Sequence, residues 1–330
     1  MKYLVIGLGS MGKRRVRHLI AFNHDIIGFD IRQDRCDETH EKFNIPVFLT
    51  FEAAVKEQPD VFFICAPPVF HAEYMKYAVN MKKHFFVEKP VSHSLDFLEE
   101  ILIKANANGK VALPSYNMRN HICVRKIKEL LDMDLIGPVI TGFSDVGEYL
   151  PDWHPYEDYR VYYPSKKALG GWIDHACEFE WLMWLLGDIS RISTFGGKLS
   201  SLDVDTYDVL EVMLEFRGGA ILGLHTDLIQ RQYNRSLKLI GEKGTIVWDG
   251  VTNTIKVFDP AKRSWVVYFD SHDENNKKYN EDMYVEETRH FIQCILGKEK
   301  PANTLEREIH ILKIMLAMFE SAEKNLHIAL

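Results

Sequence analysis

The feature that most constrains the fold is a glycine-rich turn near the N-terminus, set between a strand pattern and a helix pattern. Residues 3–6, Tyr-Leu-Val-Ile, have the apolar and β-branched character of a buried strand, and GLGSMG follows at residues 7–12. Residues 13–22 then place apolar side chains at helical spacing. A strand, a tight turn and a helix in this order are typical of the first part of a doubly wound α/β sheet.

Three glycines in this turn match the G-x-G-x-x-G pattern of dinucleotide-binding proteins. Gly7 allows the tight turn, Gly9 lets the backbone approach a pyrophosphate, and Gly12 lets helix and strand pack closely. Ser10 and Met11 open the helix, whose first N–H groups are expected to face the anion. The pattern alone is common by chance, but its place between a strand and a helix makes it specific.

A carboxylate stands at the end of the second strand pattern, DIIGFD. Asp30 is expected to accept hydrogen bonds from both hydroxyls of an adenosine ribose, and its charge repels a 2′-phosphate. The sequence therefore predicts NAD as the cofactor. Arg32 weakens this preference because its guanidinium could turn toward a phosphate, so NADP is not excluded.

Strand and helix patterns continue to alternate along the first third of the chain. Strand patterns recur near Val47, at VFFICAPP and at Phe85–Val87, with helix patterns between them. Strands separated by helices pair in parallel through right-handed crossovers. We therefore predict an α/β protein with an N-terminal doubly wound Rossmann domain.

The last of these strands runs directly into charge, in the sequence HFFVEKP. Ligands of a doubly wound sheet bind beyond the carboxyl ends of its strands, so Lys89 is expected where a nicotinamide ring and its substrate meet. Pro90 fixes the local backbone and ends the strand. The alternative is a surface ion pair between Glu88 and Lys89, which the end of a buried strand disfavours.

These segments together resemble the glucose–fructose oxidoreductase / inositol dehydrogenase family, called Gfo/Idh/MocA. The resemblance rests on VIGLGSMG, Asp30, CAPPVFHAEY, KKHFFVEKP and YNMR, and extends more loosely through the segment near 170–187. It implies an NAD(P)-dependent oxidoreductase that transfers a hydride between nicotinamide and a carbinol or ketone carbon of a sugar or sugar derivative.

The resemblance also assigns roles to single residues. It implies that Lys89 is the catalytic lysine and that Glu88 helps to position the cofactor and this lysine. Beside the reacting C–O bond, an ammonium polarises a ketone or stabilises a developing alkoxide. Burial beside an oxidised nicotinamide is expected to lower the pKa of the lysine toward a value useful for proton transfer. The residues implied to line the dinucleotide are Ala66, Pro67 and His71.

Beyond about residue 139 the sequence reads mainly as antiparallel strands, such as DVLEVMLEF and AILGLHTDL, followed by two helix patterns near the C-terminus. We predict a dinucleotide-binding domain at 1–118 and a substrate-binding and oligomerisation domain at 119–330, whose C-terminal helix is expected to pack back on the first. The resemblance implies an α+β second domain with a large open, mostly antiparallel sheet. It further implies a homodimer or homotetramer formed through that sheet.

The segment LGGWIDHACEFEWLMWLLG, residues 169–187, is expected to carry the general acid/base but does not identify it uniquely. The resemblance implies an aspartate at the start of a helix and a histidine one turn later. Asp174 fits the aspartate, although a simple N-cap is the alternative. Cys177 or Glu178 occupies the place of the histidine, and His175 is the only imidazole nearby. Three hypotheses remain open: His175 or Glu178 transfers the proton, Lys89 acts alone, or catalysis has been lost.

Several aromatic and polar residues are predicted to contact the substrate. Aromatic faces pack well against the C–H surface of a carbohydrate, and packing between domains is the alternative. The segment PDWHPYEDYR resembles a branch of the family associated with cell-surface sugar synthesis, and its arginine suits the phosphate or carboxylate of a nucleotide-linked sugar. The predicted substrate residues are Tyr116, Asn117, Trp153, Tyr159, Arg160 and Glu178.

Composition excludes other classes of function. The chain has 330 residues and a formal net charge of −7, without a basic stripe, so no nucleic-acid partner is expected. Its five cysteines lie far apart and form no CxxC pair, which predicts neither a disulfide framework nor a metal site. No apolar run approaches the ~20 residues that span a bilayer, and the apolar N-terminal run is too short for a signal peptide. We expect a cytoplasmic protein that binds no membrane.

Two alternatives to a dehydrogenase remain. Some relatives of the family are glycosidases that hold NAD tightly and use it for transient oxidation. The displaced helix histidine also leaves open a non-catalytic dinucleotide-binding protein.

Overall fold

The computed structural model describes residues 1–154, 157–171, 177–270 and 276–330, except for the side chains of 276–279. The chain divides into two compact units. Unit 1 comprises Met1–Tyr116 and Val285–Leu312, and unit 2 comprises Asn117–Tyr284 and Lys313–Leu330. The predicted domains, 1–118 and 119–330, differ from these units chiefly because 285–312 belongs to unit 1.

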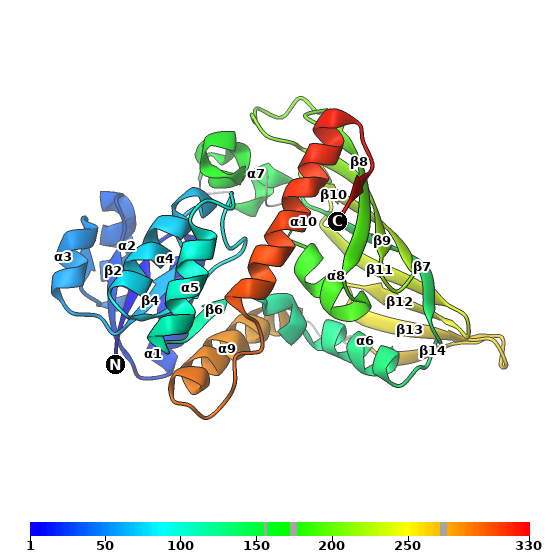
Figure 1. The fold of residues 1–330 in the computed structure, drawn as a ribbon, viewed down its shortest axis with the longest axis horizontal. Coiled ribbons are helices and arrows are strands. Elements are labelled where there is room, and N and C mark those ends of the chain that lie inside the picture. Colours follow the sequence, from blue (N-terminus) through cyan, green and yellow to red (C-terminus); the bar gives the residue numbers. More distant parts are fainter. Residues whose placement is uncertain (155–156, 172–176, 271–275) are drawn as a thin grey trace. The chain divides into compact units, whose positions relative to one another are not determined.

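Unit 1 is built on a six-stranded parallel sheet with the strand order β3-β2-β1-β4-β5-β6 (Figure 1). This is the order of a doubly wound sheet, and it confirms the predicted Rossmann domain. The strands are β1 (Lys2–Ile6), β2 (Asp25–Phe29), β3 (Val47–Phe48), β4 (Val61–Ile64), β5 (His84–Val87) and β6 (Ala112–Pro114).

Some of the helix ends in unit 1 have caps that the local sequence provides. The Thr50 hydroxyl accepts the Ala53 N–H at the start of α3, and Asn44 and Gly109 end α2 and α5 in the left-handed conformation. The helices are α1 (Ser10–Ala21), α2 (Gln33–Phe43), α3 (Phe51–Lys56), α4 (His71–Asn80) and α5 (Leu98–Asn108), with the 3-10 turn η1 (Pro68–Phe70) before α4.

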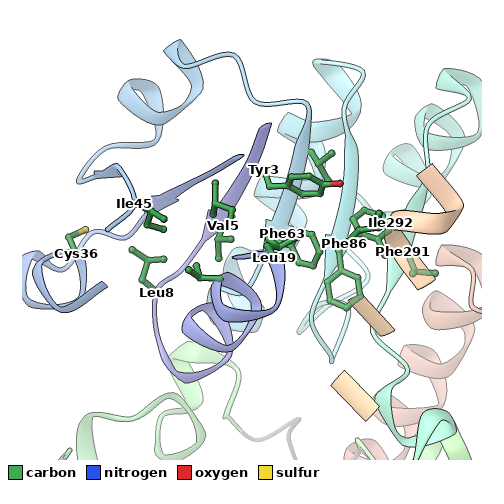
Figure 2. Close-up of a cluster of buried hydrophobic side chains, with 14 of the residues drawn as sticks. Tyr3, Val5, Leu8, Leu19, Cys36, Ile45, Phe63, Phe86, Phe291 and Ile292 are labelled. Carbon is green, nitrogen blue, oxygen red and sulfur yellow. The ribbon is translucent and has the colours of Figure 1, made fainter. Parts of the chain in front are cut away.

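The core of unit 1 includes side chains from the distant segment 285–312 (Figure 2). Phe63 and Phe86 stack with ring centroids 5.1 Å apart, and Phe291 meets Phe63 edge-on at 5.3 Å. Phe291 and its neighbour Ile292 are buried there. They come from the end of α9 (Asn276–Ile295), so this helix contributes directly to the apolar contacts that stabilise unit 1.

Unit 2 is built on a nine-stranded sheet with the order β14-β13-β12-β11-β7-β10-β9-β8-β15 (Figure 1). Among the described strands of this sheet, only β7 and β10 pair in parallel, which confirms the predicted large, mostly antiparallel sheet. The strands are β7 (Val139–Gly147), β8 (Ile189–Gly197), β9 (Val209–Phe216), β10 (Ile221–Asp227), β11 (Asn234–Gly241), β12 (Thr245–Asp249), β13 (Thr254–Asp259), β14 (Ser264–Phe269) and β15 (Ile328–Ala329).

The two faces of this sheet differ. Along β9, Leu210, Val212 and Leu214 are buried, while Glu211 and Met213 alternate with them on the opposite face. Figure 1 shows α6 and α8 on the same face of the sheet. The helical segments of unit 2 are η2 (Asn117–Asn120), α6 (Ile122–Asp132), α7 (Leu150–Trp153), η3 (Tyr159–Val161), η4 (Tyr163–Ser165), η5 (Lys167–Leu169), α8 (Phe179–Leu186), the beginning of α9 and the end of α10 (Leu305–Lys324). Among the described residues, no helix combines the length and the apolar character needed to cross a membrane.

Candidate active site

The glycine-rich turn between β1 and α1 has the tight geometry that its sequence predicts. Gly7 has a φ of +87°, and a side chain on it would lie 2.8 Å from the backbone of Cys65 and Ala66. A side chain on Gly12 would lie 1.8 Å from the carbonyl oxygen of Gly7. Both positions therefore require glycine, because a larger residue would force α1 and β4 away from the turn.

Gly9 differs from these two glycines. A side chain on it would come no closer than 3.5 Å to a neighbour, Nη1 of Arg35, which is ordinary contact. Gly9 is the N-cap of α1, and among the described residues no side chain caps the helix there. The N–H groups around Ser10 and Met11 are thus placed to bind an anion. The protein's own packing does not explain Gly9, and the predicted approach of a pyrophosphate to this residue stays a prediction.

Asp30 lies directly after β2 and holds the glycine turn. Its Oδ2 accepts the Leu8 N–H at 2.7 Å, and its Oδ1 accepts the Arg32 N–H at 2.9 Å. The Arg35 guanidinium lies 3.8 Å from the same carboxylate. The Arg32 guanidinium pairs with Asp34, with Nε 3.0 Å from Oδ1, and these hydrogen bonds lower the pKa of Asp34 to about 2. The Arg32 guanidinium thus has a carboxylate partner two residues along the chain.

The strand register aligns the predicted cofactor residues along one edge of the sheet. Ile6 pairs with Phe29 on one side and with Ile64 on the other, and Ile64 pairs with Val87. These four residues end or nearly end their strands, so the residues that follow them form a row. The row runs from Asp30 after β2, through Gly7 and Cys65, to Glu88 and Lys89 after β5.

His71, the first residue of α4, is buried and bridges two loops. Its Nδ1 lies 2.9 Å from the carbonyl oxygen of Pro90, and its Nε2 lies 2.6 Å from that of Ala66. Burial lowers the pKa of His71. Ala66 and Pro67 lie in the loop after β4 that this ring ties to the loop after β5. The predicted contact of these three residues with the dinucleotide stays a prediction.

Glu88 is buried beside a fully buried arginine that the sequence analysis missed. Its Oε1 accepts a hydrogen bond from Nε of Arg15 at 2.6 Å. Arg15 also pairs through Nη2 with Glu287 and donates from Nη1 to the Thr288 hydroxyl at 2.9 Å. Glu287 in turn accepts hydrogen bonds from the Ser115 hydroxyl at 2.9 Å and from the backbone of residue 116 at 2.5 Å.

A partial signal for this cluster exists in the sequence. Arg15 falls on the same helix face as Gly12, Val16 and Leu19, all of which are buried in α1. An arginine on a buried face needs a buried acceptor, because an unpaired charge there is costly. The identity of the acceptors, Glu88 and Glu287, is not local information.

The first two predicted substrate residues, Tyr116 and Asn117, are both buried. Tyr116 belongs to unit 1, where its ring lies edge-on to His290 at 5.9 Å. Asn117 belongs to unit 2, where Nδ2 lies 3.7 Å from the sulfur of Met283 and Oδ1 is buried without a hydrogen-bond partner among the described residues.

Two of the three predicted substrate residues within 153–160, after β7, belong to one apolar cluster. Trp153 and Tyr159 pack against Leu150, Val204 and Leu228. The Tyr159 hydroxyl also accepts the backbone N–H of residue 203 at 3.2 Å. The guanidinium of the neighbouring arginine, residue 160, is exposed and pairs with residue 158.

Glu178, at the N-cap of α8, has both carboxylate oxygens engaged. Oε1 accepts a hydrogen bond from Nη2 of Arg235 at 3.0 Å, and Oε2 accepts the indole N–H of Trp181 at 2.8 Å. Asp174 and His175, the predicted acid/base residues, lie outside the described residues. The structure thus brings the predicted cofactor residues of unit 1 together, while the catalytic and substrate roles in unit 2 stay predictions.

Two successive segments of the chain match the two domains of one family. Residues 1–116 match the NAD-binding Rossmann fold of an oxidoreductase family, GFO_IDH_MocA, and residues 124–247 match the GFO/IDH/MocA C-terminal domain. The myo-inositol 2-dehydrogenase of Thermotoga maritima is 25% identical, over 99% of this chain and 96% of that protein.

Solved structures share the fold at low sequence identity. Levoglucosan dehydrogenase, in complex with NADH and levoglucosan, has a TM-score of 0.85 at 15% identity and covers 100% of this chain and 99% of its own. The WlbA dehydrogenase of Bordetella pertussis, in complex with NADH and UDP-GlcNAcA, has a TM-score of 0.81 at 15% identity, with 100% and 97% covered. The family, the fold and the NAD-binding domain predicted from the sequence are thereby confirmed. We conclude that this chain belongs to the Gfo/Idh/MocA family of NAD-binding oxidoreductases.

Proposed function

We propose that this chain transfers a hydride between NAD and a carbinol or ketone carbon of a sugar, a cyclitol or a sugar derivative. The row of residues along the edge of the unit 1 sheet carries the proposal. Asp30 and Lys89 follow strands that are three positions apart, a separation of roughly 14 Å at the usual strand spacing. A dinucleotide with its ribose at Asp30 and its pyrophosphate at the N-terminus of α1 extends toward Lys89.

Bound NAD supplies the acceptor, and its reduced form the donor, of the hydride at the nicotinamide ring. The Lys89 ammonium stabilises negative charge on the reacting oxygen, because a cation fixed near that atom acts most strongly where charge develops. In the direction of oxidation, the hydroxyl proton leaves the substrate as the C–H hydride departs. We assign this proton to the neutral imidazole of His175, with Asp174 as its partner, while the Lys89 ammonium stays charged beside the oxygen. Glu178 is less suited to it, because Arg235 and Trp181 engage both of its oxygens.

The proposed substrate class rests on the aromatic residues of unit 2 and on the relatives. Trp153 and Tyr159 offer flat apolar faces of the kind that pack against sugar C–H groups. The relatives named above act on or bind a cyclitol, an anhydrosugar and a nucleotide-linked sugar. We therefore include nucleotide-linked sugars in the class, for which the exposed Arg160 would meet a phosphate or carboxylate.

Replacement of Lys89 by methionine tests the proposal. We expect Lys89→Met to lower kcat by about 10²–10³-fold, the usual cost of removing one group that stabilises the charge on a reacting oxygen. The dissociation constant for NADH, measured by fluorescence titration, should stay within about threefold because the glycine turn and Asp30 are unchanged. Lys83→Met, just before β5, is the control and should leave both quantities unchanged.

Other outcomes would identify the alternatives. Loss of NADH binding together with turnover in Lys89→Met would give this lysine a structural role. Release of free sugar from a glycoside, without net NADH, would identify an NAD-dependent glycosidase. NADH binding without turnover on a broad panel of sugars and nucleotide sugars would identify a non-catalytic binding protein.

We further propose that copies of this chain pair through the sheet of unit 2 and that the protein works in the cytoplasm. On the face of the sheet opposite the buried leucines of β9, Phe143, Met213 and Ile221 are exposed on three adjacent strands. Adjacent exposed apolar side chains of this kind are typical of an interface. Light scattering of the purified chain tests the pairing, and a monomer at micromolar concentration would rule it out.

A further inference from the structure

Lys89 lies between two residues whose positions are fixed by buried groups. On one side, the Glu88 carboxylate binds the guanidinium of Arg15, and its backbone N–H donates to the carbonyl oxygen of Ile64 at 3.0 Å. On the other side, the carbonyl oxygen of Pro90 lies 2.9 Å from the ring of His71. The peptide that carries Lys89 is therefore held at both ends.

The group that holds Glu88 is itself held from a distant part of the chain. Arg15 is buried against the ring of Phe86, with Cζ 4.5 Å from the ring centroid, and its guanidinium is shared between Glu88 and Glu287. Glu287 is anchored by the Ser115 hydroxyl and by the backbone after it. The contacts therefore form a chain: Glu287 of α9 binds Arg15 of α1, and Arg15 binds Glu88 at the end of β5.

The cluster is a poor device for stability alone. It places one cation and two carboxylates where all three side chains are nearly or fully buried. Buried ion clusters often stabilise a fold less than apolar residues of the same volume, because desolvation offsets their attraction. Burial raises the pKa of Glu287, because removal from water disfavours the charged form of its carboxyl group. Phe63, Phe86 and Phe291 already provide an apolar core beside it.

We propose that Arg15 and Glu287 are positioning residues for Lys89. Arg15 fixes Glu88 and Glu287 fixes Arg15, so that the amine of Lys89 is presented at a constant place on the sheet edge. The inference rests on the proposed function, in which Lys89 handles the reacting oxygen. A shift of about 1 Å in such a group can slow a reaction by roughly a hundredfold.

Two substitutions test the cluster from its two ends. Arg15→Lys keeps the positive charge but loses the planar fork that binds two carboxylates at once. Glu287→Gln keeps an oxygen for Ser115 and the backbone, but its amide turns a donor toward Arg15. The matched controls are Arg17→Lys, an exposed position on α1, and Glu286→Gln, which pairs with Arg289 on α9.

We expect both substitutions to lower kcat by about 10- to 100-fold, while KM for the sugar and the dissociation constant for NADH change by less than about threefold. The deuterium isotope effect on kcat for reduction with [4,4-²H₂]NADH should rise, because hydride transfer becomes slower relative to product release. A variant that merely contained less folded protein would show an unchanged isotope effect. The two controls should behave as the wild type in every measurement.

The outcomes separate this inference from the proposed function. Wild-type kcat and isotope effect in both variants would overturn the positioning role while leaving the proposed function intact. Loss of NADH binding, or failure of both variants to fold, would show that the cluster serves stability, and would also overturn the positioning role. A wild-type protein that binds NADH but turns over none of the sugars would overturn the proposed function itself.

Discussion

At the scale of single residues, Asp30 has two roles in unit 1. Its two oxygens accept the backbone N–H groups of Leu8 and Arg32, and so fix the glycine turn at which we propose that the pyrophosphate binds. The same carboxylate is the group that an adenosine ribose would meet. Because Arg35 lies 3.8 Å away, the negative charge of Asp30 also restrains a guanidinium that could otherwise bind a phosphate.

Removal of that charge should relax the choice of cofactor. We expect Asp30→Asn to lower the preference for NAD over NADP by at least about tenfold, because the amide no longer repels a 2′-phosphate and no longer holds Arg35. Two charges 4 Å apart near a protein surface interact by roughly 4 kcal/mol, more than the about 1.4 kcal/mol of a tenfold change. The ratio of kcat/KM for the two cofactors measures the effect.

The control for this change is Asp37→Asn, on the exposed side of α2, where a hydrogen bond to Gln33 is altered but no cofactor residue is touched. Its cofactor preference should equal that of the wild type. An unchanged preference in Asp30→Asn would place the discrimination in another part of the site.

Local sequence was sufficient for some site residues and insufficient for others. The places of Gly7, Asp30 and Lys89 just after β1, β2 and β5 were predictable, because each stands at a fixed offset from a strand pattern. Arg15 and Glu287 were not, because they lie 272 positions apart and only the folded chain shows that they pair. The same holds for Glu178 and Arg235, which come together from α8 and β11.

At the scale of elements, β9 and β10 are joined by an ionic contact as well as by their backbone ladder. His225 of β10 lies with Nε2 2.8 Å from Asp227 and Nδ1 2.7 Å from Glu211 of β9. Asp145 of β7 lies opposite it in the register. The hydrogen bond to Asp227, with that to Glu211, raises the pKa of His225 to about 9.

This contact should make stability depend on alkaline pH. The pKa of an unfolded histidine is about 6.5, so the stabilisation is complete below that value and is lost as the pH rises through about 9. Because His225 is partly exposed, we expect a loss of only about 1–2 kcal/mol in the free energy of unfolding. Urea unfolding at about pH 6 and about pH 9.5 measures it.

His225→Gln provides the comparison, because glutamine keeps a donor but cannot take a charge in this range. The variant should lack this part of the pH dependence and should be less stable than the wild type mainly at the lower pH. An equal pH dependence in both proteins would show that the ion pair is not responsible.

The order of strands in the sheet of unit 2 could be predicted only in part from the apolar and polar pattern of each strand. Alternation of apolar and polar residues predicted β9 and β10, and the short turn between them predicted their antiparallel pairing. The parallel pairing of β7 with β10 was not predictable from these patterns, because β8 and β9 intervene in the chain. Periodicity states which face of a strand is buried, but not which strand lies beside it.

At the scale of the whole molecule, unit 1 is complete only with a segment from near the C-terminus. Val285–Leu312 supplies Phe291 and Ile292 to its core and Glu287 to its buried charge cluster. Residues 1–118 look like a complete Rossmann domain in the sequence because all the strands and the glycine turn are present. The hydrophobic core of unit 1 nevertheless includes Phe291 and Ile292, so residues 1–118 alone lack part of that core.

We therefore expect a polypeptide of residues 1–118 to unfold without cooperativity and to bind NADH weakly. Loss of a buried phenylalanine side chain alone typically costs about 3–5 kcal/mol, and Arg15 loses one of its two carboxylates as well. Whole domains are stable by only about 5–15 kcal/mol. The same polypeptide joined to 285–312 through a glycine–serine linker should regain a single transition in urea, followed by circular dichroism, and NADH binding. Cooperative unfolding and full NADH affinity in the shorter polypeptide would mean that the C-terminal segment packs on unit 1 without contributing to its stability.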